Sequence, residues 1–457
     1  MRSTLHDQLH LVPGAIAHVH ARELRQISVV LEQIREALGL VQADLLRRRG
    51  KQIDPTKGRD GMTAEQVVRA FLVKQMNGFS YEQLAFHLAD SSTYRAFCRI
   101  GIDEQAPTRS TLQRNIKRVE PDTWESINRS VAQYAAAVGI DAGDKVRTDC
   151  TVVKANIHDP TDSSLLRDCV RVLARLMSEA RDDFGRTFSN HNVRAKRRAM
   201  GILNAKSTEQ RLPLYVDLLR VTEKTVASSD RIAGELDQIE PVDLGEMLRA
   251  GALVVQMRHY GELAKRVISQ TQRRVLGGES VPATDKLVSI FEPHTDIIVK
   301  DRRETLYGHK ICLTSGASGL VSDVVIEAGN PCDSTLALKM IQRQRDIYGK
   351  APRQATFDGG FSSRANLTSL KELGVDDVAF SKGRGLEITD MVKSSWVYRC
   401  LRNFRAGIEG TISFLKRVFG LDRCAWSGLR SFKAYVCGSV LACNLLLIAR
   451  HQSQSSS

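Results

Sequence analysis

The sequence lacks the patterns that mark secreted, zinc-binding and membrane-spanning proteins. Its nine cysteines are scattered, odd in number and free of any Cys-x2-Cys pair, which argues against a disulfide framework and a structural zinc site. The longest apolar run, Val436–Ile448, contains polar interruptions and is too short to span a bilayer, so it predicts a buried helix. The N-terminus shows neither an apolar core nor a small-residue cleavage site, so no export signal is expected. These absences favour a protein of the reducing cytoplasm without a membrane partner.

The chain carries an excess of positive charge. Its 66 lysines and arginines outnumber its 52 aspartates and glutamates, which gives a formal net charge of +14. Such a balance favours a polyanionic partner, with nucleic acid as the first candidate and an anionic membrane surface as the second. At 457 residues the chain is long enough for two or three domains and a sizeable core.

Residues 1–60 are predicted to contain an amphipathic helix followed by a basic linker. Apolar residues recur three and four apart in a heptad-like seam: Leu24, Ile27, Leu31, Ile34, Leu38, Val41 and Leu45. This period favours a helix that packs against another helix. The seam either joins two copies of the chain or packs within its own domain, and Gly39 weakens a free-standing coiled coil.

Residues 61–140 are predicted to form an all-α domain that binds DNA. Thr63 and Ser80 stand at N-cap positions, each before a run with helical apolar periodicity. A third helix opens at Pro107 and carries a basic side: Arg109, Arg114, Lys117 and Arg118. Short helices that end in a capped basic helix are typical of helix-turn-helix DNA binding. The alternative is a helical bundle with an ordinary solvated basic face.

Residues 141–450 alternate between strand-like and helical patterns, which predicts an α/β domain with one mixed sheet. Strands are expected at Lys145–Ala155, Gln354–Asp358 and Asp377–Ser381, and a β-hairpin around Gly316. Between about residues 163 and 280 the patterns become long, helical and densely charged, which predicts a helical insertion into this domain. Residues 451–457 are expected to form a disordered tail.

Three segments, far apart in the sequence, each carry one acidic residue in a setting that suggests chemistry. Asp149 lies near the middle of a strand-like run, where aspartate is unfavourable, and Asp358 ends another such run. Glu409 lies four residues after Arg405 on one face of a predicted helix, which alone would also fit a solvated helix face. Two strand-borne aspartates and one helix-borne glutamate are the ligand set that a two-metal phosphoryl-transfer site requires.

These segments resemble the DDE triad of bacterial insertion-sequence transposases, which carry an RNase H-like catalytic domain. Asp358-Gly-Gly-Phe is similar to the motif of their second aspartate. Arg405, Glu409 and Lys416 match three of the four positions of the Tyr-x2-Arg-x3-Glu-x6-Lys signature, with Arg402 in place of the tyrosine. The helical segment Met62–Val119 is also similar to the N-terminal domain of these enzymes. The resemblance covers most of residues 55–450 and is nearest to the ISNCY group.

The resemblance implies metal-dependent cleavage and transfer of DNA strands. Asp149, Asp358 and Glu409 would be the catalytic residues and the ligands of two Mg²⁺ ions, for which Mn²⁺ can substitute, because hard divalent cations prefer carboxylate oxygens. Water would first attack at the transposon end, and the freed 3′-OH would then attack target DNA. Arg405 and Lys416 would hold DNA phosphates.

The implied partners are double-stranded DNA, as terminal inverted repeats and as target, and a second copy of the chain in the DNA complex. The place of action would be the bacterial cytoplasm, at the nucleoid. Two alternatives remain: a stand-alone nuclease of RNase H-like fold, and a catalytically silent DNA-binding regulator derived from a transposase. Other acidic and histidine residues near the strands are interpreted as turn or structural residues: Asp159, Asp162, Asp376, Asp377, His158 and His309.

Overall fold

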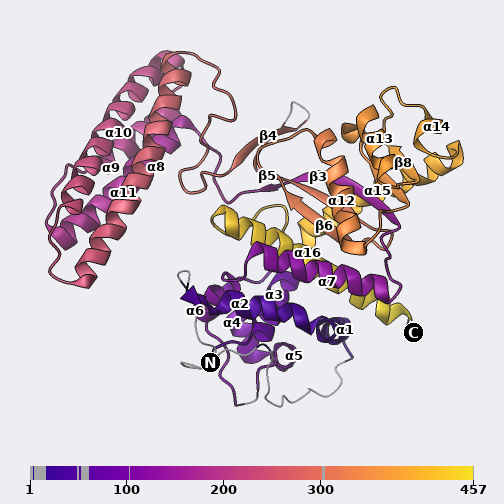
Figure 1. The fold of residues 1–457 in the computed structure, drawn as a ribbon. Coiled ribbons are helices and arrows are strands. Elements are labelled where there is room, and N and C mark those ends of the chain that lie inside the picture. Colours follow the sequence, from indigo (N-terminus) through magenta and orange to yellow (C-terminus); the bar gives the residue numbers. More distant parts are fainter. Residues whose placement is uncertain are drawn as a thin grey trace. The chain divides into compact units, whose positions relative to one another are not determined.

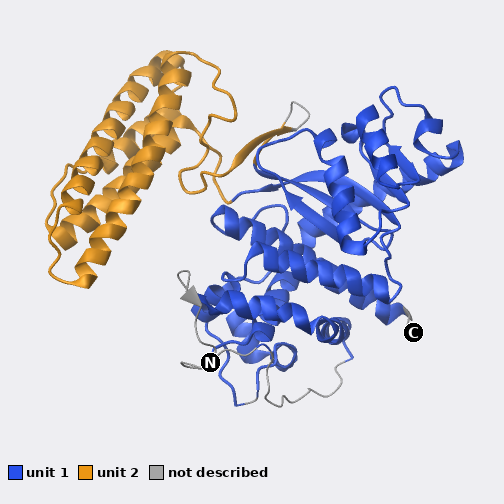
Figure 2. Cartoon of the chain, in the orientation of Figure 1, with its two compact units in different colours: residues 1–155, 308–457 blue, residues 156–307 orange. Residues whose placement is uncertain are grey.

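The computed structural model describes residue 4 and residues 17–48, 51–52, 61–101, 103–300 and 304–455. Its internal contacts divide the chain into two compact units (Figures 1 and 2). Unit 1 comprises Met1–Ala155 and Gly308–Ser457, and unit 2 comprises Asn156–Tyr307. Most of the predicted basic linker before Gly61 lies outside the described residues, apart from the short antiparallel pair β1 (Arg47–Arg48) and β2 (Lys51–Gln52).

A mixed sheet carries both strand-borne aspartates. Its strands are β3 (Lys145–Lys154), β5 (Glu304–Ser315), β6 (Val321–Ile326), β7 (Gln354–Phe357), β8 (Asp377–Phe380) and β4 (Asp296–Lys300). The strand order is β4-β5-β3-β7-β8, and β6 also pairs with β5. β3 runs antiparallel to β5 and parallel to β7, while β5 and β6 form the predicted hairpin. The prediction of an α/β domain with one mixed sheet is confirmed, and its RNase H-like identity stays a prediction.

Helices of the C-terminal half accompany the strands of this sheet that belong to unit 1 (Figure 1). They are α12 (Ala337–Tyr348), α13 (Arg364–Glu372), α14 (Ile388–Met391) and α15 (Ser395–Val418). An apolar core joins α12 and α13 to the strands, with Phe357, Phe380 and Met340 fully buried in it. α15 contacts β3, β7 and β8, so this one helix passes the strands that carry the two aspartates.

The N-terminal helices share a second apolar core of unit 1 with α16 (Leu429–Ser455). They are α1 (Val19–Gln33), α2 (Leu38–Leu46), α3 (Ala64–Asn77), α4 (Tyr81–Asp90), α5 (Ser92–Phe97), α6 (Arg109–Ile116) and α7 (Pro121–Ala137). Thr63 and Ser80 are N-caps, as predicted, and they form capping boxes with Gln66 and Gln83. One core therefore continues from the N-terminal helices through α16 to the hairpin strands β5 and β6.

The predicted continuous helix over the apolar seam is wrong in one respect. A 3-10 turn at Arg35–Ala37 divides it into α1 and α2. The seam residues from Leu24 to Leu45 are all buried, and they pack in the core of unit 1 against helices that include α3, α7 and α16. The seam thus packs within its own unit, and its apolar surface is not exposed to a second copy.

α16 is the longest apolar helix of unit 1. By length and composition it could cross a membrane, yet 89% of its most apolar window is buried, as in the core helix that the run Val436–Ile448 predicts. The prediction of a disordered tail is wrong for residues 451–455, because α16 continues to Ser455, and residues 456–457 lie outside the described part of the chain. Gln452 donates a hydrogen bond to the hydroxyl of Tyr134 at 2.9 Å, which ties this end of α16 to α7.

Unit 2 is a bundle of four helices with its own apolar core. The helices are α8 (Asp162–Phe184), α9 (Asn192–Asn204), α10 (Thr208–Asp237) and α11 (Leu244–Thr271). A short π-helical turn, Gln272–Leu276, follows α11. Leu166 and Leu173 of α8 are fully buried, and ion pairs such as Arg194–Asp217 lie on the outside of the bundle.

Candidate active site

The register of two parallel strands brings Asp149 and Asp358 together. Thr148 of β3 stands opposite Phe357 of β7, so the next residue along each strand is one of the two aspartates. Asp149 lies within β3, whereas Asp358 directly follows the last residue of β7. The strand-to-strand spacing of about 5 Å therefore sets the separation of these two backbone positions.

α15 adds an arginine that contacts all three predicted acidic residues. The Nη2 atom of Arg405 lies 3.0 Å from Oδ2 of Asp149 and 3.4 Å from Oδ1 of Asp358. Its Nη1 atom lies 3.3 Å from Oε1 of Glu409, one turn further along the helix. Side-chain exposure rises from 16% for Asp149 through 44% for Asp358 to 68% for Glu409. The site is therefore open to solvent on the Glu409 side and closed at Asp149.

The two aspartates differ in their electrostatic surroundings. Burial raises the pKa of Asp149, although the amide of Cys150 and the charge of Arg405 act in the other direction. Burial also acts to raise the pKa of Asp358, but the Ser381 hydroxyl, two backbone amides and Arg405 outweigh it, so that pKa is lowered. The surroundings therefore favour the ionised form of Asp358 and disfavour that of Asp149, relative to each group in water.

The two glycines after Asp358 leave no room for side chains. A Cβ atom on Gly359 would lie 2.9 Å from Cβ of Lys382, and one on Gly360 would lie 2.7 Å from Oδ2 of Asp333. The chain packs closely here and directs the amides of both glycines toward the Asp358 carboxylate. This explains the Asp-Gly-Gly-Phe motif in steric terms.

The donor chemistry of the three carboxylates fits a hard divalent cation. Oxygen donors from two aspartates and a glutamate are the ligands that Mg²⁺ and Mn²⁺ prefer. Within the described residues, no three acidic, cysteine or histidine side chains stand close enough to hold a metal ion together. The guanidinium of Arg405 instead supplies the positive charge between the carboxylates.

Sequence reasoning missed a second arginine that joins β3 to α15. The Nη1 atom of Arg147 donates a hydrogen bond to the carbonyl of Phe404 at 3.0 Å, and its guanidinium lies 4.8 Å from the centre of that ring. Its Nε atom donates to the hydroxyl of Ser315 at 2.9 Å. The sequence could have indicated Arg147 by its position two residues before Asp149, because alternate residues of a strand share one face.

The other predicted DNA contacts fall into two groups. Arg109 and Arg114 are exposed on α6, and Arg109 forms a 3.5 Å ion pair with exposed Glu82. Lys117 lies 5.9 Å from the ring centre of Trp426, and the carbonyl of Arg118 accepts a hydrogen bond from Arg430. These last two positions therefore also join the N-terminal helices to the start of α16. Lys416 is half-buried on α15, three turns after Arg405.

The remaining acidic and histidine candidates take part in other contacts. In unit 1, Asp377 is buried and accepts hydrogen bonds from Gln354 and the amide of Lys393, and His309 packs against the Phe432 ring. In unit 2, Asp162 pairs with Arg274, and His158 lies 3.8 Å from Asp168. Asp376 pairs with Arg353 on the surface. None of these residues joins the carboxylates around Arg405.

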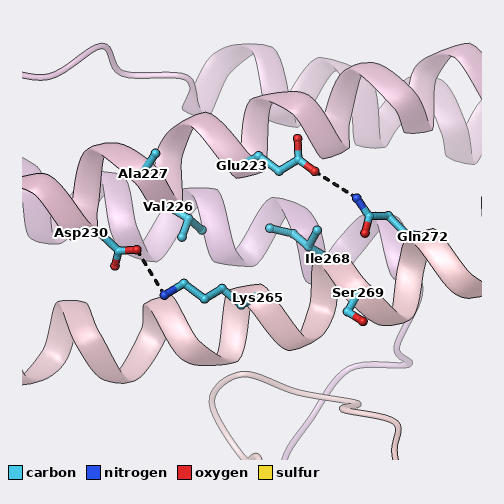
Figure 3. A pocket seen from close by; sticks show the side chains of 8 residues that line it. All are labelled: Glu223, Val226, Ala227, Asp230, Lys265, Ile268, Ser269 and Gln272. Atoms are coloured by element: carbon cyan, nitrogen blue, oxygen red, sulfur yellow. Dashed lines mark hydrogen bonds and ion pairs between the residues drawn. The ribbon is translucent and has the colours of Figure 1, made fainter.

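Unit 2 has a shallow groove between α10 and α11 (Figure 3). Two polar contacts cross it, from Lys265 to Asp230 at 3.2 Å and from Gln272 to Glu223 at 3.0 Å. Val226 and Ile268 are among its apolar lining residues. Every lining residue belongs to unit 2, so the groove contains none of the predicted catalytic residues.

Two family models match separate parts of the chain. A transposase domain (DUF772) matches residues 20–118, and a transposase DDE domain matches residues 299–445. A comparison with curated proteins and another with solved structures found no match. The second matched segment contains Asp358, Arg405, Glu409 and Lys416, whereas Asp149 and most of unit 2 lie outside both segments. The chain belongs to the DDE transposases of insertion sequences.

Proposed function

We propose that this transposase binds the ends of its element and performs metal-dependent cleavage and transfer of DNA strands, with Asp149, Asp358 and Glu409 as catalytic residues. One observation carries the proposal: three carboxylates from distant segments converge on the guanidinium of Arg405. An acidic cluster around one cation supports a site for divalent metal ions, and the transposase family supports DNA as the substrate.

The three carboxylates would hold Mg²⁺ or Mn²⁺, which, when bound, supplies Lewis-acid activation of the attacking and leaving oxygens of a phosphodiester. The carboxylate of Asp358 is oriented by three hydrogen-bond donors, the Ser381 hydroxyl and the amides of Gly359 and Gly360. Asp149 lies at the buried end of the site, where its carboxylate accepts a hydrogen bond from the amide of Cys150. Glu409, the most exposed of the three, faces solvent, from which DNA would approach. Arg405 neutralises part of the carboxylate charge and is also placed to hold a phosphate.

DNA contacts outside the catalytic site belong to this proposal as well. The exposed residues Arg109 and Arg114 on α6 would contact phosphates of the transposon end, because their guanidinium groups are accessible. Lys416 would contact DNA near the catalytic site, as the family signature implies. Lys117 and Arg118 would contribute from the edge of the same surface. A homodimer would bring two transposon ends together.

The proposal is tested by incubating the full-length chain with labelled DNA that carries the element's own ends, with and without Mg²⁺. Glu409→Gln should abolish 3′-end cleavage and strand joining, because an amide oxygen lacks the charge that holds a divalent cation. Binding of the ends, measured by gel shift, should stay within a few-fold of wild type.

Arg402→Gln is the matched control, since Arg402 lies on the same helix and makes none of the contacts that join Arg405 to the carboxylates. Cleavage by Glu409→Gln at near wild-type rate would overturn the site. Cleavage without joining would indicate a nuclease, and tight end binding without cleavage under Mg²⁺ or Mn²⁺ would indicate a silent DNA-binding regulator.

A further inference from the structure

We infer that Arg147 is a positioning residue, which locks α15 against β3 and thereby sets the place of Glu409 and Arg405 opposite Asp149. The effect of Arg147 on catalysis rests on the proposed function. The contact by which Arg147 holds α15 against β3, called the lock below, is a property of the folded chain. Three features of the structure support this role: the contacts of the Arg147 side chain, the space that Gly407 leaves for it, and the face of β3 from which it projects.

The Arg147 side chain is bound at both ends of its guanidinium. Nε donates to the Ser315 hydroxyl of the neighbouring strand, directly opposite Arg147 in the β3–β5 register. Nη1 donates to the main-chain carbonyl of Phe404, in the middle of α15. Because a planar guanidinium has fixed donor directions, these two bonds together fix its orientation, and with it the distance of α15 from the strand.

Gly407 makes this close approach possible. A Cβ atom at this position would lie 1.9 Å from Nη1 of Arg147 and 2.9 Å from its Cζ atom. Any other residue would therefore push the guanidinium away or lift the helix. Glycine is unfavourable inside a helix by about 1 kcal/mol relative to alanine. The contact with Arg147 thus explains why a glycine stands inside α15, two residues before Glu409.

Alternate residues of β3 form a row that faces α15. The ammonium of Lys145 lies 4.5 Å from the centre of the Phe404 ring, the guanidinium of Arg147 lies 4.8 Å from it, and Asp149 pairs with Arg405. Phe404 and Arg405 are adjacent on the helix. A displacement of α15 that breaks the Arg147 contact would therefore also move Arg405 and Glu409 relative to Asp149.

A double-mutant cycle tests the lock in the full-length chain with Arg147→Ala, Gly407→Ala and the double variant. The first readout is amide hydrogen exchange of residues 401–411 in the protein alone. Gly407→Ala should accelerate this exchange about tenfold in the wild-type background but less than about twofold in the Arg147→Ala background, where the added methyl group finds space. Gly410→Ala is the matched control, because nothing lies within 4 Å of a Cβ atom there, and it should leave the exchange unchanged or slower.

The second readout is the Mn²⁺ concentration that gives half-maximal cleavage of labelled element ends. Arg147→Ala and Gly407→Ala should each raise it about tenfold, and the double variant should resemble Arg147→Ala alone. Additive effects on exchange would overturn the lock. Coupled effects on exchange with an unchanged Mn²⁺ dependence would overturn the positioning role. If the wild type cleaves no DNA, the proposed function falls, and the exchange data still decide the lock.

Discussion

At the scale of single residues, the site is a cluster of three negative charges around one positive charge. Like charges within about 6 Å disfavour each other's ionised form, and a cation among them relieves that cost. Arg405 contacts each carboxylate at 3.0–3.4 Å, so it stabilises the cluster in the protein alone. It also competes with any other cation that these oxygens bind.

Arg405→Ala should therefore strengthen the binding of Mn²⁺ to the protein alone. Removal of one positive charge from a partly solvated site should raise the affinity about fivefold to tenfold, because a charge pair at this distance is worth about 1 kcal/mol or somewhat more. Calorimetric titration with Mn²⁺ measures the effect. Arg402→Ala removes the same charge from the same helix and should change the affinity less than about twofold. Equal changes in both variants would indicate a general charge effect and no specific competition.

The two aspartates should give opposite pH dependences of stability. Burial raises the pKa of Asp149, so the folded chain retains this proton to higher pH than the unfolded chain. The contribution of Asp149 to stability is therefore fully present below its ordinary pKa of 3.8, and it is lost as pH rises through the raised pKa of the folded chain. For Asp358, burial is outweighed by hydrogen bonds and Arg405, so its pKa is lowered. Its contribution to stability is present above 3.8 and is lost as pH falls through the lowered pKa.

Thermal unfolding from about pH 3 to pH 7 measures these two contributions. The Tm of Asp149→Asn minus that of wild type should rise with pH, whereas the same difference for Asp358→Asn should fall. Two slopes of the same sign would contradict either the net effect of burial at Asp149 or the combined effect of the hydrogen bonds and Arg405 at Asp358.

At the scale of elements, the sequence patterns predicted those strands, helix caps and helices that depend on neighbouring residues in the chain. The strands around Asp149 and Asp358, the capping boxes at Thr63 and Ser80, and the helix that bears Glu409 follow from alternation, caps and helical periodicity. The break at Arg35–Ala37 was not predicted, because the apolar seam continues through it and only packing on other helices distinguishes the two cases.

The meeting of the carboxylates depends on strand register and helix placement, neither of which a single sequence encodes locally. The parallel register of β3 and β7 becomes predictable only once these strands are known to be neighbours. The contact between Arg147 and Gly407 joins residues 260 positions apart in the numbering and leaves no periodic trace. Family resemblance supplied the predicted triad, whereas the contacts that bring its residues together had to come from the structure.

α16 contains a polar residue whose role is structural. Asn444 is buried, its side chain accepts a hydrogen bond from the amide of Val321 at 2.8 Å, and it donates to the carbonyl of Val321 at 2.7 Å. It also donates to Asn128 of α7 at 2.8 Å. The helix thus pairs with the first residue of β6 in the way that a neighbouring strand would, and it joins the sheet to α7.

Asn444→Leu should destabilise the chain although it makes α16 more apolar. It leaves the buried Val321 amide without its partner, which costs about 1–3 kcal/mol of unfolding free energy. Urea denaturation measures the loss. Leu445→Met, a volume-conserving change at the next position of the same helix, should cost less than about 1.5 kcal/mol. A stability of Asn444→Leu equal to or above wild type would show that the Asn444 contacts do not anchor β6.

At the scale of the whole molecule, the apolar residues form cores that respect the division into two units. The N-terminal helices, α16 and one side of the sheet share one core, and α12 and α13 cover the strands with another, both in unit 1. The helices α8 to α11 enclose a third core in unit 2. Because each core consists of residues from one unit, loss of packing in unit 2 should leave the core of unit 1 intact.

Leu173→Ala tests this separation. Leu173 is fully buried in α8, and its truncation should reduce the stability of unit 2 by about 2–5 kcal/mol through lost burial and the cavity left behind. Hydrogen exchange should then become faster in α8–α11, while α3, α7 and α16 keep their wild-type protection. Leu441→Ala, at a fully buried position of α16, is the matched variant in unit 1 and should give the reverse pattern. If each variant accelerates exchange equally in both units, the chain unfolds as one cooperative body. The two units would then not unfold independently, although their cores are separate.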